Sequence, residues 1–217
     1  MGQEQTPAKV SDIDLAFTCR RSLAAQSGVE RWVVRAVLAG PDSGDAERRS
    51  GSASAGEEPV GRIEVLSVDL TRCRDPWGEL DASNDAVAHM GETVFDQNTG
   101  QLAEAFDSRL RRVGERVLVV DYVELEPAWQ RQNLAALLVA ESLDQLRADC
   151  RVMVCLPGPL ERRDLDDAEH EEALRRMQAV WAQVGFTPYE DGVWFLDPHP
   201  RTLQESLVRL RGLHDVS

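Results

Sequence analysis

The segment Leu118–Val139, LVVDYVELEPAWQRQNLAALLV, decides the fold class of this chain. It begins inside a strongly apolar run, Arg116–Leu125, which is typical of a strand at the centre of a sheet. Pro127 ends that strand, because proline has no N–H to donate to a β-ladder. A helix rich in Leu and Ala is predicted over Leu134–Arg147. It is apolar nearly all round, so we expect it to pack deeply against the sheet.

The part of the chain before this segment predicts three strands joined by short or irregular links. Alternating apolar and polar residues mark these strands, over Asp12–Cys19, Trp32–Ala39 and Val60–Leu70. Short links favour an antiparallel arrangement of neighbouring strands. Residues 1–10 are polar and predicted to be a flexible tail, and residues 41–58 lack periodicity and are predicted to be a mobile loop.

Residues 74–115 change character and are predicted to be a helical insertion between the third and fourth strands. One helix would bury Val87, Met90 and Val94, and a second would start at Thr99 and carry apolar residues at helical spacing as far as Val113. The chain after the central helix predicts a second buried strand over Arg151–Leu156, which completes a right-handed strand–helix–strand unit.

The C-terminal third continues the alternation of helices and strands. Apolar residues from Leu174 to Val184 form the stripe of a helix that Gly185 ends, and Trp194–Leu196 is a last strand. A capping box opens a C-terminal helix over residues 201–213. We therefore predict one α/β domain over residues 1–217, with a mixed central sheet flanked by helices and a ligand-binding core over residues 116–196.

Composition excludes several functional classes. The 217 residues include 24 basic and 38 acidic side chains, a net charge of −14 that argues against a nucleic-acid-binding protein. No apolar run approaches the roughly 20 residues that span a bilayer, so we expect a soluble, cytoplasmic protein. The four cysteines contain no C-x-x-C pair and the histidines lack ligand spacing. Neither a disulfide framework nor a metal site is predicted.

The turn between the central strand and its helix is the best candidate for a binding site. Backbone N–H groups at the start of a helix converge with the positive end of its dipole, which favours a phosphate or diphosphate. Asn133 tolerates a left-handed conformation better than other non-glycine residues. The small side chain of Ala135 leaves room for the backbone to approach a ligand.

At these residues the chain resembles the GNAT superfamily of N-acetyltransferases. The family's turn reads Q/R-x-x-G-x-G/A, and Gln130–Ala135 is similar to it except that Asn133 replaces the first glycine. The later segment Val180–Phe186, VWAQVGF, is similar to the family's helix that ends in x-Y-x-x-x-G-F. The resemblance covers about the C-terminal half of the chain.

The resemblance implies a GNAT-like acyltransferase fold with acetyl-CoA as co-substrate. It also implies direct transfer of the acetyl group to a primary amine, whose identity the sequence does not give. The donor's diphosphate would lie on the backbone amides of Gln130, Arg131, Gln132, Asn133, Leu134 and Ala135. Its pantetheine arm would pair with Val123 and Leu125 like an added strand.

Two departures from the family pattern concern catalysis. Trp181 stands where family members carry a tyrosine acid, and Val119 stands where some carry a glutamate base. Asp121 is one candidate general base, since it shares the face of Val119 if no bulge intervenes, and Glu124 is the other but points the opposite way.

Two functions therefore stay open. The first is an N-acyltransferase, in which the insertion walls the amine pocket with Trp77, His89 and Phe95 as candidate lining residues. The second is a catalytically degenerate GNAT-like domain that serves as a CoA-binding or protein-interaction module. A homodimer formed through the C-terminal helix is a further expectation.

Overall fold

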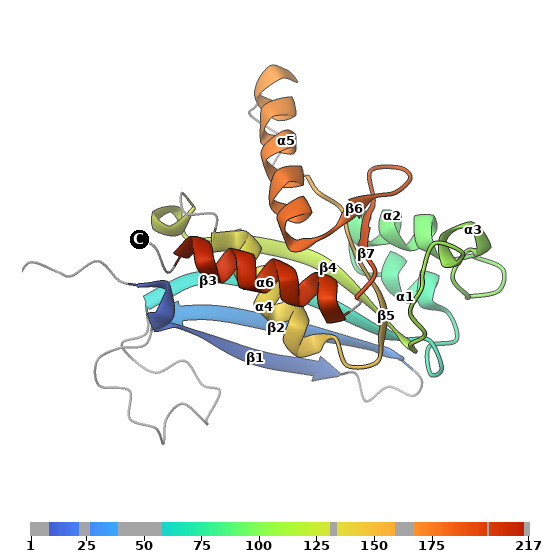
Figure 1. Cartoon of the computed structure of the whole chain (residues 1–217). Coiled ribbons are helices and arrows are strands. Elements are labelled where there is room, and N and C mark those ends of the chain that lie inside the picture. The colour runs from blue at the N-terminus through green and yellow to red at the C-terminus, as the bar shows by residue number, and fades with distance from the viewer. Residues whose placement is uncertain are drawn as a thin grey trace, which may run out of the picture.

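The computed structural model describes residues 9–21, 27–38, 58–130, 134–158, 167–198 and 200–214. Within them, one seven-stranded mixed sheet carries helices on both faces (Figure 1). The predicted α/β architecture is therefore confirmed. The predicted tail and the predicted loop 41–58 lie almost wholly outside the described residues. A 3-10 turn begins at Val10 and a strand at Glu58.

Apart from α1 and β6, which were not predicted, the observed elements follow the predicted order. The strands are β1 Ile13–Arg21, β2 Val29–Leu38, β3 Glu58–Asp69, β4 Arg116–Leu125, β5 Cys150–Cys155, β6 Thr187–Pro188 and β7 Trp194–Leu196. The helices are α1 Pro76–Asp81, α2 Asp85–Val94, α3 Glu104–Asp107, α4 Leu134–Leu146, α5 Asp167–Val184 and α6 Pro200–His214, with 3-10 turns η1 Val10–Asp12 and η3 Pro127–Trp129. Gly185 ends α5 with a φ of 113°, as its position in the sequence predicted.

The sheet order is β1-β2-β3-β4-β5-β7-β6. The first four strands form antiparallel neighbours, which confirms the predicted arrangement of the first three. β4 and β5 are parallel and are connected through α4, as the strand–helix–strand pattern predicted. No helix in the described part of the chain is both long and apolar enough to cross a bilayer.

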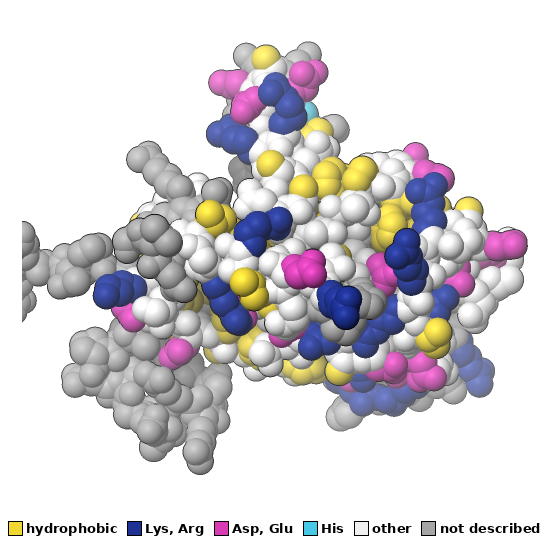
Figure 2. Space-filling view, viewed as in Figure 1, with side chains coloured by type: hydrophobic (Ala, Val, Ile, Leu, Met, Phe, Trp, Pro, Cys, Tyr) yellow, Lys and Arg dark blue, Asp and Glu magenta, His cyan; other side chains and the backbone are white. Residues whose placement is uncertain are grey.

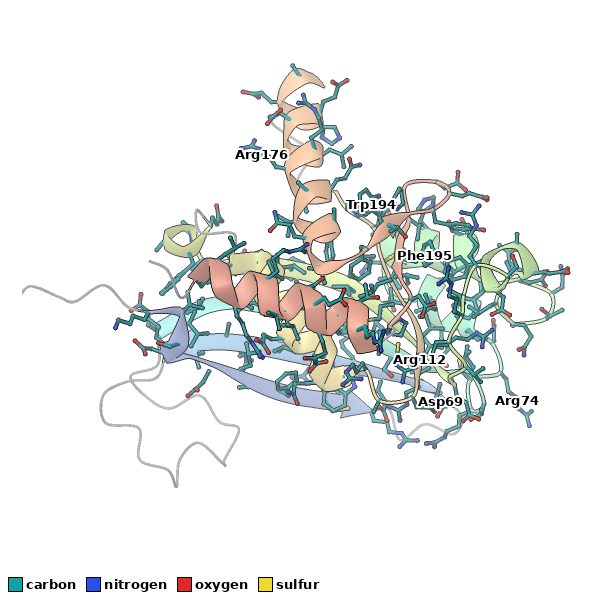
Figure 3. All side chains as sticks on the ribbon, viewed as in Figure 1. Asp69, Arg74, Arg112, Arg176, Trp194 and Phe195 are labelled. Atoms are coloured by element: carbon teal, nitrogen blue, oxygen red, sulfur yellow. The ribbon has the colours of Figure 1, made fainter. Side chains whose placement is uncertain are left out.

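Two apolar clusters lie on the two faces of the sheet, and β4 contributes to both. Leu118 and Val120 pack with α4, α5 and α6, whereas Val117 and Val119 pack with α1, α2 and α3. On β7 the neighbours Trp194 and Phe195 likewise pack on opposite clusters (Figure 3). The alternation of a strand's side chains thus joins both helical layers to one sheet.

The insertion contains less helix than predicted. The helix expected from Thr99 to Val113 is reduced to the four residues of α3, and the side chain of Val113 is 86% exposed. The Asp96 carboxylate accepts hydrogen bonds from the backbone N–H groups of Asn98 and Thr99, and Gly100 has a φ of 66°. These local bonds hold a turn where a helix was expected, because a short acidic side chain competes with helical backbone bonds.

Candidate functional site

The sheet splits between its two parallel strands. Pairing of β4 with β5 ends at Val120, opposite Cys155, whereas β4 continues to Leu125 beside β3. From Asp121 to Leu125, the edge of β4 that faces away from β3 therefore has no partner strand among the described residues. Figure 1 shows that α5, which follows β5 along the chain, projects away from the sheet.

Backbone groups of Val123 and Leu125 point to this open edge. The N–H of Glu126 donates to the carbonyl of Val60 in β3, at 2.9 Å. Because successive residues of a strand point their backbone groups to opposite edges, those of Val123 and Leu125 face away from β3. The side-chain amide of Gln130 donates to the Leu125 carbonyl at 3.0 Å, so this acceptor is already engaged.

The turn after β4 is described at its two ends. Gln130 is exposed and follows η3, and α4 starts at Leu134, whose side chain is fully buried. Ala135 is half-buried in the first turn of α4. Arg131, Gln132 and Asn133, three of the predicted diphosphate-binding residues, lie outside the described residues. Because the Leu134 side chain is fully buried, this residue has only backbone groups with which to contact a ligand.

A bulge in β4 changes which side chains share a face. Val120 pairs with Val65 and Tyr122 pairs with Glu64, so Asp121 is an extra residue between two paired positions. Val123 and Leu125 pack with the α4 side, so Tyr122 and Glu124 lie on the opposite face, the one that Asp121 also occupies. The prediction that Glu124 points away from Asp121 was therefore wrong, because the bulge shifts the alternation by one residue.

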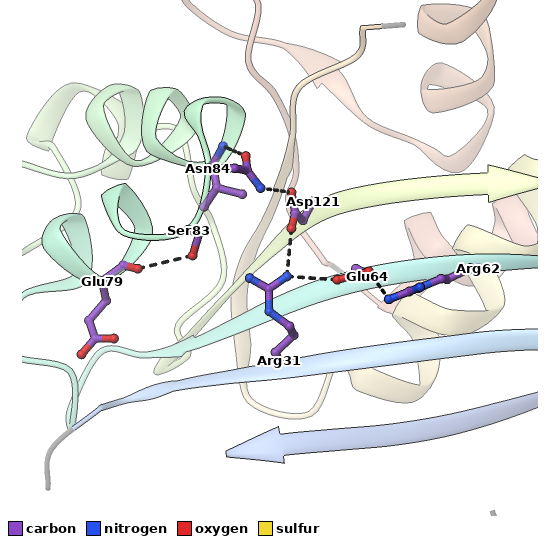
Figure 4. A network of polar contacts seen from close by, with 8 residues as sticks. Arg31, Arg62, Glu64, Glu79, Ser83, Asn84 and Asp121 are labelled. Carbon is purple, nitrogen blue, oxygen red and sulfur yellow. Dashed lines mark hydrogen bonds and ion pairs between the residues drawn. The ribbon is translucent and has the colours of Figure 1, made fainter. Parts of the chain in front are cut away.

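The Asp121 carboxylate is the centre of a polar network (Figure 4). Its Oδ1 accepts from the side-chain amide of Asn84 at 2.8 Å, and its Oδ2 accepts from the Arg31 guanidinium at 3.1 Å. Arg31 also donates to Glu64 at 3.0 Å, and Glu64 pairs with Arg62. The Asp121 side chain is 10% exposed.

This network joins the insertion to the sheet. The Asn84 side-chain oxygen accepts from the N–H of Val87 and so caps α2, while its amide nitrogen binds Asp121. Both Asp121 oxygens are thus engaged by donors of the protein itself. Asp121 therefore holds α2 on the bulge of β4.

Glu124 has a different environment. It is exposed, it lies next to the open edge, and its Oε2 accepts a hydrogen bond from the Tyr122 hydroxyl at 2.8 Å. The hydrogen bond to Glu124 is the main factor that raises the pKa of Tyr122. The other Glu124 oxygen, Oε1, is not used by this bond. Of the two candidate bases, Glu124 is therefore the accessible one.

The side chains of Trp181 and Tyr189 pack against other aromatic rings. Trp181 is 6% exposed and its ring lies 5.1 Å from that of Phe186, at an interplanar angle of 78°. Tyr189 packs against Phe106 with ring centroids 4.9 Å apart, and the Arg109 guanidinium lies over its ring. Both rings therefore contribute to packing.

The three candidate lining residues of the insertion have different surroundings. Phe95 is 2% exposed and belongs to the core. His89 lies with its Nε2 atom 2.8 Å from the backbone carbonyl of Asp191, so α2 touches the turn before β7. The indole N–H of Trp77 is buried without a hydrogen-bond partner among the described groups. Their role at an amine pocket stays a prediction.

Comparison with known proteins gave no match: no family model, curated protein or solved structure resembles this chain closely enough to be significant.

The double role of Asn84 gives a testable stability effect. Asn84→Ala removes both the α2 cap and the contact with Asp121, and should cost about 1–2 kcal/mol in the free energy of unfolding. Asn84→Ser keeps a cap but is too short to reach Asp121, so its cost should be smaller. Urea denaturation of both variants measures the two contributions. Equal stability of the two variants and the wild type would contradict the proposed docking.

Proposed function

We propose that this protein is an N-acyltransferase that uses acetyl-CoA and transfers the acetyl group directly to a primary amine. The observation that carries the proposal is the open edge of β4, which begins where β5 ends and leads into the turn before α4. A split between two parallel strands beside a helix N-terminus offers both a strand-like docking edge and an anion site. The resemblance of Gln130–Ala135 and Val180–Phe186 to the GNAT superfamily supports the same function.

The residues at the split fit the proposed donor. The backbone of Val123 faces the open edge and can pair with amide groups of an extended ligand. Gln130 and the first turn of α4 flank the place where a diphosphate would meet the helix dipole. Acetyl-CoA would supply a thioester whose carbonyl carbon is open to attack by an amine.

Glu124 is the residue to which we assign the proton transfer. An amine must lose a proton as its nitrogen forms the new C–N bond, and the C–S bond then breaks to release the thiolate. Glu124 can accept that proton, while the Tyr122 hydroxyl holds its other oxygen in place. A backbone N–H on the open edge, such as that of Val123, can donate to the carbonyl oxygen. We assign no protein acid to the thiolate.

A second candidate is a catalytically degenerate module that binds CoA or a protein partner. The burial of Trp181, which stands at the position of the family's tyrosine acid, favours this alternative. The engagement of both Asp121 oxygens favours it as well. Binding of acetyl-CoA without release of free thiol across a panel of primary amines would support the module over the enzyme.

Thermal unfolding in the presence of acetyl-CoA or free CoA tests the donor site. A ligand at 100 times its dissociation constant stabilises the folded state by about 2.7 kcal/mol, so the melting temperature should rise. Ala135→Trp should abolish this rise, because a bulky side chain in the first turn of α4 blocks the approach of the diphosphate. Ala105→Trp, at an exposed position of α3, is the matched control and should keep it. No rise in the wild type at millimolar ligand would overturn both the enzyme and the CoA-binding form of the module.

A further inference from the structure

We propose that β1 pairs with β1 of a second copy of the chain, around a two-fold axis through Phe17. The sheet would then continue through both subunits. The surface lies at the β1 edge of the sheet, with β2 and β3 between it and β4, so this proposal does not depend on the acyltransferase function.

β1 has the properties of a strand edge that can accept another strand. It runs for nine residues in an uninterrupted register with β2, and no other described strand pairs with it. Its sequence, IDLAFTCRR, contains no proline or lysine, and its register shows no bulge. Proline, lysine and bulges usually protect an exposed edge from pairing, and β1 lacks all three.

The charges on β1 are complementary to themselves in one symmetric register. An antiparallel pair centred on Phe17 places Asp14 opposite Arg20 of the partner subunit, and the symmetry produces this pair twice. Asp14 and Arg20 are both exposed and form no ion pair with the described residues. Within the sheet, Arg20 lies beside Arg31 of β2, a neighbour of like charge. A carboxylate on the open side of Arg20 would therefore be favourable.

The apolar face of β1 matches in the same register. Phe17 would lie against Phe17 of the partner subunit, and Leu15 would lie opposite Cys19 of the partner subunit. Ile13, Leu15 and Phe17 are half-buried at the margin of the core. Beside Ile13 and Leu15 lies a hollow of about 360 Å³ that Leu137 and Leu138 of α4 also line. A second β1 would cover apolar surface that α4 and α6 leave accessible.

The competing surface is α6, which exposes Val208 and Leu213. On the face shown in Figure 2, the apolar side chains form small patches between charged ones of both signs. Scattered exposed apolar residues are normal on a monomer, so α6 offers a weaker self-complementary surface than β1.

Charge reversal tests the pairing directly. Asp14→Arg and Arg20→Asp each turn two attractive cross-strand pairs into repulsive ones, and each should raise the dimer dissociation constant by about tenfold or more. The double variant Asp14→Arg/Arg20→Asp restores opposite charges and should recover most of the wild-type affinity. Glu92→Arg makes the same charge change as Asp14→Arg, at an exposed position of α2, and should leave the affinity unchanged. Sedimentation velocity over a dilution series measures all four.

A disulfide test identifies the strand register. In a Cys19→Ser background, Phe17→Cys places two thiols at the symmetry axis and should give a covalent dimer under mild oxidation. Leu213→Cys in the same background, on α6, should not. A monomer at every concentration would overturn the proposal. So would a dimer insensitive to both single reversals, or one cross-linked through Leu213→Cys, and the last would assign the interface to α6.

Discussion

Glu124→Gln should lower the rate of thiol release from acetyl-CoA by about 10²-fold or more, the usual contribution of a general base. The glutamine side chain keeps the size and a hydrogen-bonding oxygen for Tyr122, but it cannot accept the proton of the amine. The substitution is at an exposed position, so folding should be unaffected. The rise in melting temperature with acetyl-CoA should therefore remain, while turnover falls with any primary amine that the wild type acetylates.

Substitutions at two other carboxylates test whether Glu124, and not Asp121, is the general base. Glu126→Gln makes the same chemical change at an exposed residue just beyond β4 and should leave the rate unchanged. Asp121→Asn should lower the melting temperature of the free protein, because it weakens the contacts with Arg31 and Asn84. If Asp121→Asn abolished turnover at unchanged stability while Glu124→Gln stayed active, Asp121 would be the base.

Phe106→Ala should have the largest effect on stability, about 3–5 kcal/mol, which corresponds to a fall in melting temperature of about 10 °C for a domain of this size. The Phe106 side chain is fully buried. Its ring lies 4.9 Å from that of Tyr189 and 5.5 Å from that of Phe195. Removing it leaves a cavity where the insertion meets the end of the sheet formed by β6 and β7.

Val113→Ala is the control for this prediction. Val113 belongs to the same insertion but is 86% exposed, so its truncation should change stability by less than about 0.5 kcal/mol. Thermal unfolding of both variants provides the comparison. If Phe106→Ala were as mild as Val113→Ala, the insertion would not be packed against β7 as the structure has it.

Much of the fold could be predicted because its signals are local. The apolar run Arg116–Leu125 has the bounds of β4, since burial on both faces selects a continuous apolar stretch and Pro127 ends it. The start of α4 at Leu134 and the end of α5 before Gly185 followed from the same kind of signal. The prediction from Thr99 to Val113 was wrong because helical spacing of apolar residues did not outweigh the turn held by Asp96.

Less of the candidate site could be predicted from the sequence. Asp121 and Glu124 could be named as carboxylates near the end of a central strand, but their different surroundings could not. Asp121 meets Arg31, 90 residues before it, and Asn84, 37 residues before it. No local pattern marks such a contact. The bulge that turns Glu124 to the same face depends on how β3 and β4 pair along their length.

The sequence by itself determined the described strands except β6, most of the helices and the succession of β4 and α4, because periodicity and chain-breaking residues act over a few neighbours. Only the tertiary structure decided that β4 extends beyond the end of its pairing with β5. The same holds for the contact of Asp121 with α2 and for the exposed position of Glu124 beside Tyr122. The register of paired strands and the partners of a charged side chain depend on residues far apart in the chain. Their contacts are fixed by the packing of the whole domain.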